Sequence, residues 1–211
     1  SVFPGAAHLR KAMYQSGWDW GPTLPDMGIF RSVELNGWDV DRLDGVAVRQ
    51  QHENGNVSVE LDVTTKCRAG CEIYAILDGK RVLLKDGHGI IKVDNPKLWW
   101  ARGYGDQRLY DLDVELVCGG RVIDCCRKRL GLRTLTVSTE PDADGKGSEF
   151  CFVLNGVKIF SMGANLVPMD SLLSRVTDRR WEAVVRQAVD ANFNTLRVWG
   201  GGYYPDSRFY E

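Results

Sequence analysis

The residues best suited to chemistry near the start of the chain form a single turn. Residues 17–22 read Gly-Trp-Asp-Trp-Gly-Pro, so one carboxylate, Asp19, stands between two indoles, Trp18 and Trp20. Such a turn suits a sugar, because sugar hydroxyls hydrogen-bond to a charged acceptor while the C–H face packs on an aromatic surface. In the alternative interpretation both tryptophans belong to a hydrophobic core and Asp19 caps a turn. Residue types alone favour neither interpretation.

A second candidate lies near the end of the chain, where Arg197 and Trp199 terminate a short apolar strand that runs into Gly200-Gly201-Gly202. A strand that stops in a glycine run leaves its last side chains free to face a ligand. In a parallel α/β barrel the carboxyl ends of the strands carry the chemistry, and a helix-like stretch over residues 178–191 precedes this strand. The alternatives are a structural ion pair for Arg197 and ordinary packing for Trp199.

Between these two segments the pattern is typical of an antiparallel sandwich. Residues 57–63 alternate apolar and polar side chains, and glycine-containing turns at Asp78-Gly79 and Gly119-Gly120 favour hairpins. About seven strands in roughly 100 residues fit an immunoglobulin-like β-sandwich. The further strands are predicted over residues 72–77, 81–84, 89–93, 109–117, 121–129 and 132–137.

The segments before and after the predicted sandwich have other sequence patterns. Alternation predicts one strand over residues 27–36, whose partner strands are missing from the sequence, and residues 139–148 have the composition of a linker. A hairpin about Asn155-Gly156 follows, then a helix for which Asp178 is the expected cap, and then a strand over residues 194–199. A complete (β/α)8 barrel needs roughly 250 residues, so at most its first strands can follow residue 150 and the chain reads as a piece of a larger enzyme.

Composition narrows the possible partners. The 27 Lys and Arg residues nearly balance the 28 Asp and Glu residues without clustering, which argues against a nucleic-acid footprint. No apolar run reaches the ~20 residues of a membrane span, and the first ten residues lack a signal-peptide layout. We therefore expect a small or uncharged partner, no membrane and a cytoplasmic location. Free thiols are expected for all six cysteines, without a metal or a cofactor, at Cys67, Cys71, Cys118, Cys125, Cys126 and Cys151.

A family resemblance links the segments. Four of them occur in an order that resembles a β-mannosidase of glycoside hydrolase family 2, and together they span nearly the whole chain. The first is Arg-Lys-Ala at residues 10–12 with the turn at 17–22. The others are residues 98–105 (Leu-Trp-Trp to Gly-Tyr-Gly), residues 163–170 (Gly-Ala-Asn to Pro-Met-Asp) and residues 194–204, which contain Arg-Val-Trp-Gly-Gly-Gly-Tyr-Tyr.

The resemblance implies a mainly β fold class with three parts. Residues 1–40 would be the C-terminal tail of a jelly-roll sugar-binding domain, 41–139 the immunoglobulin-like sandwich, and 140–211 a linker with the N-terminal part of an incomplete (β/α)8 barrel. It also implies retaining hydrolysis of terminal β-D-mannose from β-mannosides or manno-oligosaccharides, by two glutamates ~5 Å apart that lie beyond Glu211.

By the same resemblance, this segment would contribute substrate binding and no catalytic glutamate. Asp19 would accept hydrogen bonds from mannose hydroxyls, with Trp18 beside it and Trp199 as a wall of the subsite. Arg197 would keep the nucleophile ionised, and Asn165 would be a supporting residue, as would Asp170.

The sequence departs from the family pattern at several positions. Leu166 follows the asparagine where tryptophan is usual, and Ala101-Arg102 replace proline and asparagine. Two other functions stay open: a non-catalytic carbohydrate-binding or scaffold module, and a sibling β-galactosidase or β-glucuronidase. The turn at residues 17–22 argues against a sibling enzyme, because in the family that turn accompanies mannose.

Overall fold

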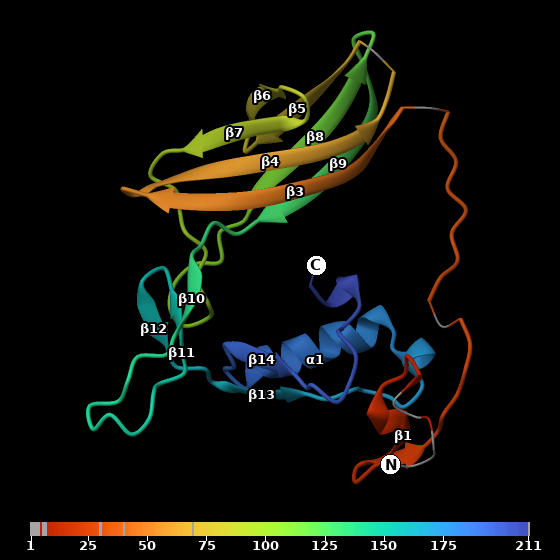
Figure 1. Cartoon of the computed structure of the whole chain (residues 1–211), viewed down its shortest axis with the longest axis vertical. Coiled ribbons are helices and arrows are strands. Elements are labelled where there is room, and N and C mark those ends of the chain that lie inside the picture. The colour runs from red at the N-terminus through yellow and green to blue at the C-terminus, as the bar shows by residue number, and fades with distance from the viewer. Residues whose placement is uncertain (1–4, 6–7, 30, 40, 69, 211) are drawn as a thin grey trace. The chain divides into compact units, whose positions relative to one another are not determined.

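The computed structural model describes residues 5, 8–29, 31–39, 41–68 and 70–210 (Figure 1). These residues form two compact units. One contains the described residues before Asn36 together with those after Phe160, and the other runs from Asn36 to Phe160. None of the described helices has the length and apolarity needed to cross a bilayer.

The unit from Asn36 to Phe160 contains two antiparallel sheets, as the alternating pattern predicts (Figure 1). The three-stranded sheet has the order β3-β4-β7, and the four-stranded sheet has the order β6-β5-β8-β9. Their bounds are β3 (Arg42–Glu53), β4 (Asn56–Lys66), β5 (Cys71–Leu77), β6 (Lys80–Leu84), β7 (His88–Val93), β8 (Tyr110–Cys118) and β9 (Arg121–Leu130). Seven strands in two sheets confirm the predicted β-sandwich.

Alternate residues of the central strands form the core of the sandwich. On β4, Val57, Val59 and Leu61 are at most 2 % exposed, while the residues between them reach the outer face. Leu112 and Leu116 on β8 are fully buried in the same cluster. Burial of one face of each strand is the reason that the apolar residues recur at every second position.

The turns between strands also follow the sequence. Asp78 and Gly79 have φ values of 49° and 87°, and Gly119 and Gly120 have 57° and 75°. Paired positive φ values suit the twist of a two-residue hairpin, and glycine adopts them without steric cost. The long strand β3 escaped individual prediction, because two half-buried positions of its second half carry the polar residues Gln50 and His52, which hide the alternation of its faces.

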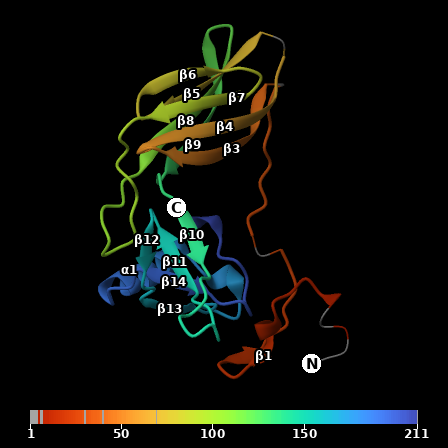
Figure 2. The same cartoon turned by 60° about the vertical axis from the view of Figure 1, so that its left-hand side comes forward.

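The strand expected over residues 132–137 divides between two sheets. Leu132 is fully buried in the sandwich core, whereas β10 (Leu135–Ser138) leaves the sandwich and pairs with β11 (Cys151–Leu154). β11 in turn pairs with β12 (Val157–Ile159) around Asn155 and Gly156, so β10, β11 and β12 form a separate small sheet (Figure 2). The predicted Asn-Gly hairpin is confirmed, and the assignment of residues 135–137 to the sandwich is wrong.

In the other unit, β13 (Gly163–Leu166) and β14 (Thr195–Val198) are parallel and are connected through α1 (Asp178–Asp190). Short 3-10 turns, η3 (Leu173–Arg175) and η4 (Ser207–Phe209), flank these elements. The predicted cap of α1 is wrong: Thr177 occupies the N-cap position with extended φ and ψ, and Asp178 is the first helical residue. The Asp178 carboxylate pairs instead with Arg208.

The beginning of the chain supplies a second small element of this unit. A 3-10 turn, η2 (Met13–Gln15), leads into the hairpin of β1 (Ser16–Trp18) and β2 (Gly21–Thr23). The strand expected over residues 27–36 is not formed by the described part of that segment, from which Phe30 is excluded. Met27, Ile29, Val33 and Leu35 are at least 82 % exposed there. An alternating segment becomes a strand only when another strand hydrogen-bonds to its edge.

Candidate functional site

The turn that carries Asp19 is held by the β1–β2 hairpin. Ser16 pairs with Thr23 and Trp18 with Gly21, which leaves Asp19 and Trp20 at the tip. Gly17 has a φ of 101°, and a Cβ on it would lie 2.7 Å from the Thr23 hydroxyl oxygen, so the glycine is required for the hairpin to close. Asp19 is exposed, and its carboxylate has no hydrogen bond or ion pair within the described ranges.

The two indoles of this turn both contact the indole of Trp199. The ring centroids of Trp18 and Trp199 are 5.3 Å apart, those of Trp20 and Trp199 are 5.8 Å apart, and both pairs are edge-to-face. Tyr14 stacks on Trp20 from the other side at 5.5 Å. The structure therefore brings the turn at the start of the chain to the end of β14, as the sequence analysis requires.

Trp199 is placed by the strand and glycine run around it. It follows the last residue of β14, and its backbone N–H donates to the Leu166 carbonyl oxygen at 3.1 Å. A Cβ on Gly201 would lie 2.2 Å from the Trp199 ring, so the indole can fold over this position only because Gly201 has no side chain. Close packing of an aromatic ring thus explains Gly201, whereas a Cβ on Gly200 would meet nothing within 4 Å and one on Gly202 would lie 2.9 Å from the Pro168 ring.

Arg197 and Asn165 are register partners on the parallel strands β14 and β13. Arg197 Nη1 donates to Asn165 Oδ1 at 2.9 Å, and both side chains are exposed. Trp199 lies two residues after Arg197, directly beyond the end of β14. Arg197 makes no ion pair with any described residue, which leaves its charge available to a ligand or to an acidic group from elsewhere in the protein.

Asp170 has a structural role in the loop after β13. Its carboxylate accepts hydrogen bonds from the Leu172 N–H and from Arg180 Nη1, each at 2.9 Å, and Arg175 lies 3.5 Å away. The Leu172 N–H, followed by the Arg180 side chain, holds the pKa of Asp170 below its usual value. Leu166, the position that departs from the family, is half-buried at the end of β13.

A pocket of about 910 Å³ adjoins Trp199 at the carboxyl ends of β13 and β14. Its walls include Leu166, Trp181, Val198, Trp199, Tyr203 and Arg208. The aromatic rings provide apolar surface, while Arg208 and its partners Asp178 and Asp206 provide charge. A concave surface of mixed character at strand ends is typical of a ligand site in α/β folds.

Sequence reasoning missed several residues that build this site. Gln15 and Tyr203 hold the hairpin against the loops after β13 and β14, and Tyr14 stacks on Trp20 at the hairpin tip. Tyr203 lies within the segment that carries the family resemblance, so its position after the glycine run was a usable signal. Gln15 carried no signal, because two of its four partners, Ser171 and Tyr203, are 156 and 188 residues away in the sequence. Nothing in the sequence around Tyr14 indicated its contact with Trp20.

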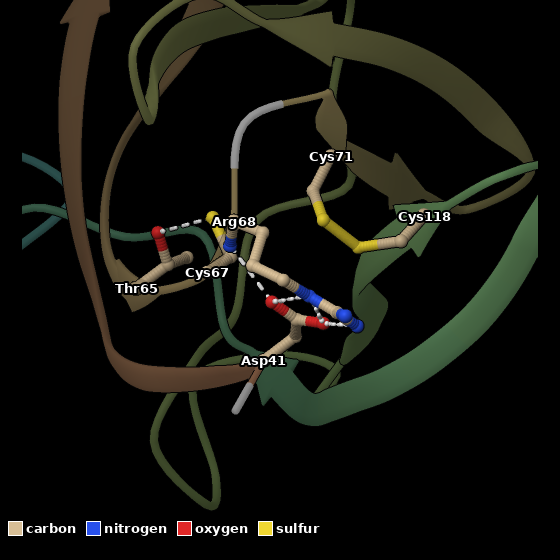
Figure 3. The surroundings of a disulfide bond; sticks show 6 residues. All are labelled: Asp41, Thr65, Cys67, Arg68, Cys71 and Cys118. Atoms are coloured by element: carbon tan, nitrogen blue, oxygen red, sulfur yellow. Dashed lines mark hydrogen bonds and ion pairs between the residues drawn. A yellow bond between two sulfur atoms is a disulfide. The ribbon is translucent and has the colours of Figure 1, made fainter. Parts of the chain in front are cut away.

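The cysteines contradict one expectation. Cys71 and Cys118 form a disulfide between register partners on β5 and β8, with Cα atoms 4.3 Å apart (Figure 3). The expectation of six free thiols is therefore wrong, because the pairing of distant strands brought two of them face to face. The same sulfurs and an Asp41 carboxylate oxygen lie within 4.8 Å of one another, but sulfurs joined in a disulfide are not thiolate ligands for a metal.

Known proteins resemble this chain over most of its length. Residues 42–133 match the model of glycosyl hydrolases family 2, and residues 2–31 match that of the glycosyl hydrolase 2 galactose-binding domain-like family. β-Mannosidase B of Emericella nidulans is 35 % identical over 96 % of this chain and 25 % of its own length. For β-mannosidase B of Aspergillus niger the identity is 33 %, over 99 % of this chain and 26 % of the relative.

Solved structures give the same result. The β-D-mannosidase of Dictyoglomus thermophilum aligns with a TM-score of 0.83 and 35 % identity, over 95 % of this chain and 26 % of that one. A β-glucuronidase of Ruminococcus gnavus aligns over 81 % of this chain with a TM-score of 0.63 and 18 % identity, which shows a shared fold alone. This chain spans about a quarter of the length of its curated relatives, and it belongs to family 2 of the glycosyl hydrolases.

Proposed function

We propose that this chain is part of a retaining β-mannosidase that removes terminal β-D-mannose from the non-reducing ends of β-mannosides or manno-oligosaccharides. Relatives about 35 % identical over nearly the whole chain carry the β-mannosidase name, which supports this specificity over that of a sibling enzyme. The β-glucuronidase resemblance, at 18 % identity, supports the fold and not the substrate.

One observation carries the proposal: Trp18 and Trp20 both contact Trp199, with Asp19 between them at the hairpin tip. This arrangement combines an unpaired carboxylate with apolar ring surface. A pyranose needs both, because its hydroxyls donate to the charged acceptor while its C–H face covers the rings. In the proposal Asp19 binds mannose hydroxyls, with Trp18 and Trp199 forming adjacent walls.

The proposal gives the strand-end pair Arg197 and Asn165 a supporting role. Retaining hydrolysis uses two carboxyl groups about 5 Å apart, one as nucleophile and one as acid/base. A guanidinium next to the nucleophile favours its ionised form. Arg197 would supply that charge, held in place by Asn165, while the two glutamates come from the part of the enzyme outside these 211 residues. β13, α1 and β14 would then be the start of the (β/α)8 barrel. The proposal keeps the expected domain boundaries after residues 40 and 139.

The test is hydrolysis by the full-length protein of p-nitrophenyl β-D-mannoside, β-D-galactoside and β-D-glucuronide. We expect the mannoside to be preferred. Asp19→Asn should lower kcat/KM for it about 10- to 100-fold, because a charge-assisted hydrogen bond contributes roughly 1.5–3 kcal/mol. Asp111→Asn, at an exposed position of β8 in the other unit, is the matched control and should change kcat/KM less than about twofold.

Other outcomes would identify the alternatives. Preference for the galactoside or glucuronide would establish a sibling specificity. Binding of mannosides without hydrolysis of any of the three would indicate a carbohydrate-binding or scaffold module. An unchanged kcat/KM in Asp19→Asn would remove Asp19 from the substrate site.

A cytoplasmic location belongs to the proposal as well, and the Cys71–Cys118 disulfide weighs against it. Cytosolic thiols are kept reduced, whereas disulfides persist mainly in oxidising compartments. Alkylation of protein taken directly from its own cells, followed by mass spectrometry, decides the matter. Alkylated Cys71 and Cys118 would support the cytoplasm, and a protected pair would support an oxidising compartment.

A further inference from the structure

Gln15 is a buried amide at the base of the Asp19 hairpin. It ends η2, directly precedes β1 and is 4 % exposed. Its Nε2 donates to Asp26 Oδ1 at 3.1 Å and to the Ser171 carbonyl oxygen at 3.3 Å. Its Oε1 accepts from Lys11 Nζ at 3.3 Å and from the Tyr203 hydroxyl at 3.4 Å. An amide offers two N–H donors and two acceptor lone pairs, so this side chain is fully satisfied.

Apart from Lys11, which precedes η2, the partners of Gln15 come from three further segments. Asp26 follows β2, Ser171 belongs to the loop after β13, and Tyr203 belongs to the loop after β14. The Tyr203 hydroxyl also accepts from the Ala12 N–H at 2.9 Å. One side chain therefore connects both ends of the hairpin region to the two strand-end loops.

The hairpin also contacts the loop after β14 through its indoles, because Trp18 and Trp20 both contact Trp199. The hydrogen bonds of Gln15 and the ring contacts thus act between the same two parts of the unit.

We propose that Gln15 is a positioning residue of the substrate site: its amide fixes the hairpin of residues 16–23 so that Asp19 stands beside Trp199. This inference rests on the proposed sugar-binding role of Asp19. Gln15 itself is buried and does not touch the ligand. Its effect is to pre-organise the turn, which lowers the cost of ordering these residues when substrate binds.

The chemistry of the site requires an amide. Glutamate at this position would place a second carboxylate oxygen against the Asp26 carboxylate and the Ser171 carbonyl oxygen, where Gln15 donates two N–H bonds. Methionine has a similar length and makes none of the four hydrogen bonds. Neither variant can restore both N–H bonds to Asp26 and Ser171, so both weaken the connection between the hairpin and the loop after β13.

The first experiment measures kcat and KM of the full-length enzyme on p-nitrophenyl β-D-mannoside for Gln15→Met, Gln15→Glu and the milder Tyr203→Phe. We expect KM to rise about tenfold in the Gln15 variants and about threefold in Tyr203→Phe, with smaller changes in kcat, because substrate binding is lost more than the chemical step. Gln51→Met, at an exposed position of β3, is the matched control. A KM within twofold of wild type in all three variants, with only the yield of active enzyme lowered, would overturn the proposal.

Hydrogen exchange of the full-length protein gives a readout that does not depend on activity. Peptides covering residues 16–24 and 199–203 should exchange at least about tenfold faster in Gln15→Met, while peptides of β4 keep their protection. Unchanged exchange in the hairpin would refute the positioning role. If the wild type fails to hydrolyse the mannoside, the proposed function fails, and the exchange experiment still decides whether Gln15 fixes the hairpin.

Discussion

At the scale of single residues, Asp19 stands out in the candidate site. Its carboxylate is exposed, has no partner among the described residues and lies in a turn with aromatic rings. Trp18 and Trp20 are 47 % and 41 % exposed, although each contacts Trp199. Large apolar side chains that remain half in water next to a charged acceptor keep both surfaces available for a ligand. Packing alone would favour their full burial.

Tyr14, which stacks on Trp20, is the opposite case, because here a polar group is buried instead of an apolar one being exposed. It is 1 % exposed, and its hydroxyl has no hydrogen-bond partner among the described residues. Burial, followed by the nearby Tyr203, Asp26 and Asp170, raises the pKa of Tyr14 to about 12. Because this pKa lies above the ordinary tyrosine pKa of 10.0, the contribution of Tyr14 to stability is complete below pH 10 and is lost as the pH rises toward 12.

We therefore expect Tyr14→Phe to raise the free energy of unfolding at pH 7 by about 1 kcal/mol, since it removes a buried hydroxyl that lacks a partner. The variant should also lose less stability than wild type when the pH is raised above 10. Urea unfolding at neutral and alkaline pH measures both effects. Tyr204→Phe, at a position that is 85 % exposed, is the control, and a lower stability of Tyr14→Phe at pH 7 would show that the hydroxyl is satisfied.

At the scale of elements, hydrogen bonds in a defined register hold the strand pairs of the sandwich together. The disulfide adds a covalent link to the pair of β5 and β8. Cys71 and Cys118 lie opposite each other on β5 and β8, separated by 47 residues of sequence. Close to the disulfide, Arg68 donates to Asp41, and this hydrogen bond holds the pKa of the Asp41 carboxyl below its usual value (Figure 3). In the unfolded chain the disulfide closes a loop that contains the residues of β6 and β7, and this loop restricts the conformations of the unfolded state.

Removal of the disulfide should destabilise the sandwich. Combined Cys71→Ala and Cys118→Ala should lower the free energy of unfolding by about 2–4 kcal/mol, the usual loss for a loop of this size. Cys125→Ala, which removes an exposed free thiol of β9, should change it by less than about 0.5 kcal/mol. Guanidinium unfolding with and without reductant provides the measurement, and an unfolding midpoint insensitive to reductant would contradict the prediction.

At the scale of the whole molecule, the chain contains a sandwich and a smaller unit that combines described residues from the N-terminal and C-terminal parts of the sequence. Described residues before Asn36 and after Phe160 belong to one compact unit, so the hairpin with Asp19 and the strand ends with Arg197 share a local structure. In the proposed enzyme this unit supplies binding groups, and the reaction requires two glutamates from elsewhere.

A direct consequence is that residues 1–211 alone should bind mannosides weakly and hydrolyse none. The full-length enzyme should release p-nitrophenol from the β-mannoside under the same conditions, which controls for the assay. Release of p-nitrophenol by the isolated 211-residue chain above the background of a mock purification would contradict the assignment of the catalytic groups to the remainder of the protein.

Local patterns in the sequence determined the elements whose formation depends on neighbouring residues. The alternation of β4, the Asp78-Gly79 and Asn155-Gly156 turns and the periodicity of α1 are all readable, because burial of one face and positive φ values impose their own spacing. The residue types around Asp19 suited a sugar and a packed core equally well, so they did not decide the ligand class. The family resemblance placed Asp19, Trp199 and Arg197 in one site.

Tertiary structure alone decided which distant residues meet. Three sets of contacts join segments far apart in sequence. They are the contacts of Trp18 and Trp20 with Trp199, the hydrogen bonds of Gln15 with Ser171 and Tyr203, and the Cys71–Cys118 bond. The position of β10 outside the sandwich and the absence of a strand among the described residues of 27–36 depend equally on which edges find a partner. Periodicity in the sequence indicates that one face of an element is buried, but it does not indicate which other element covers that face. The packing of the whole chain decides which element does so.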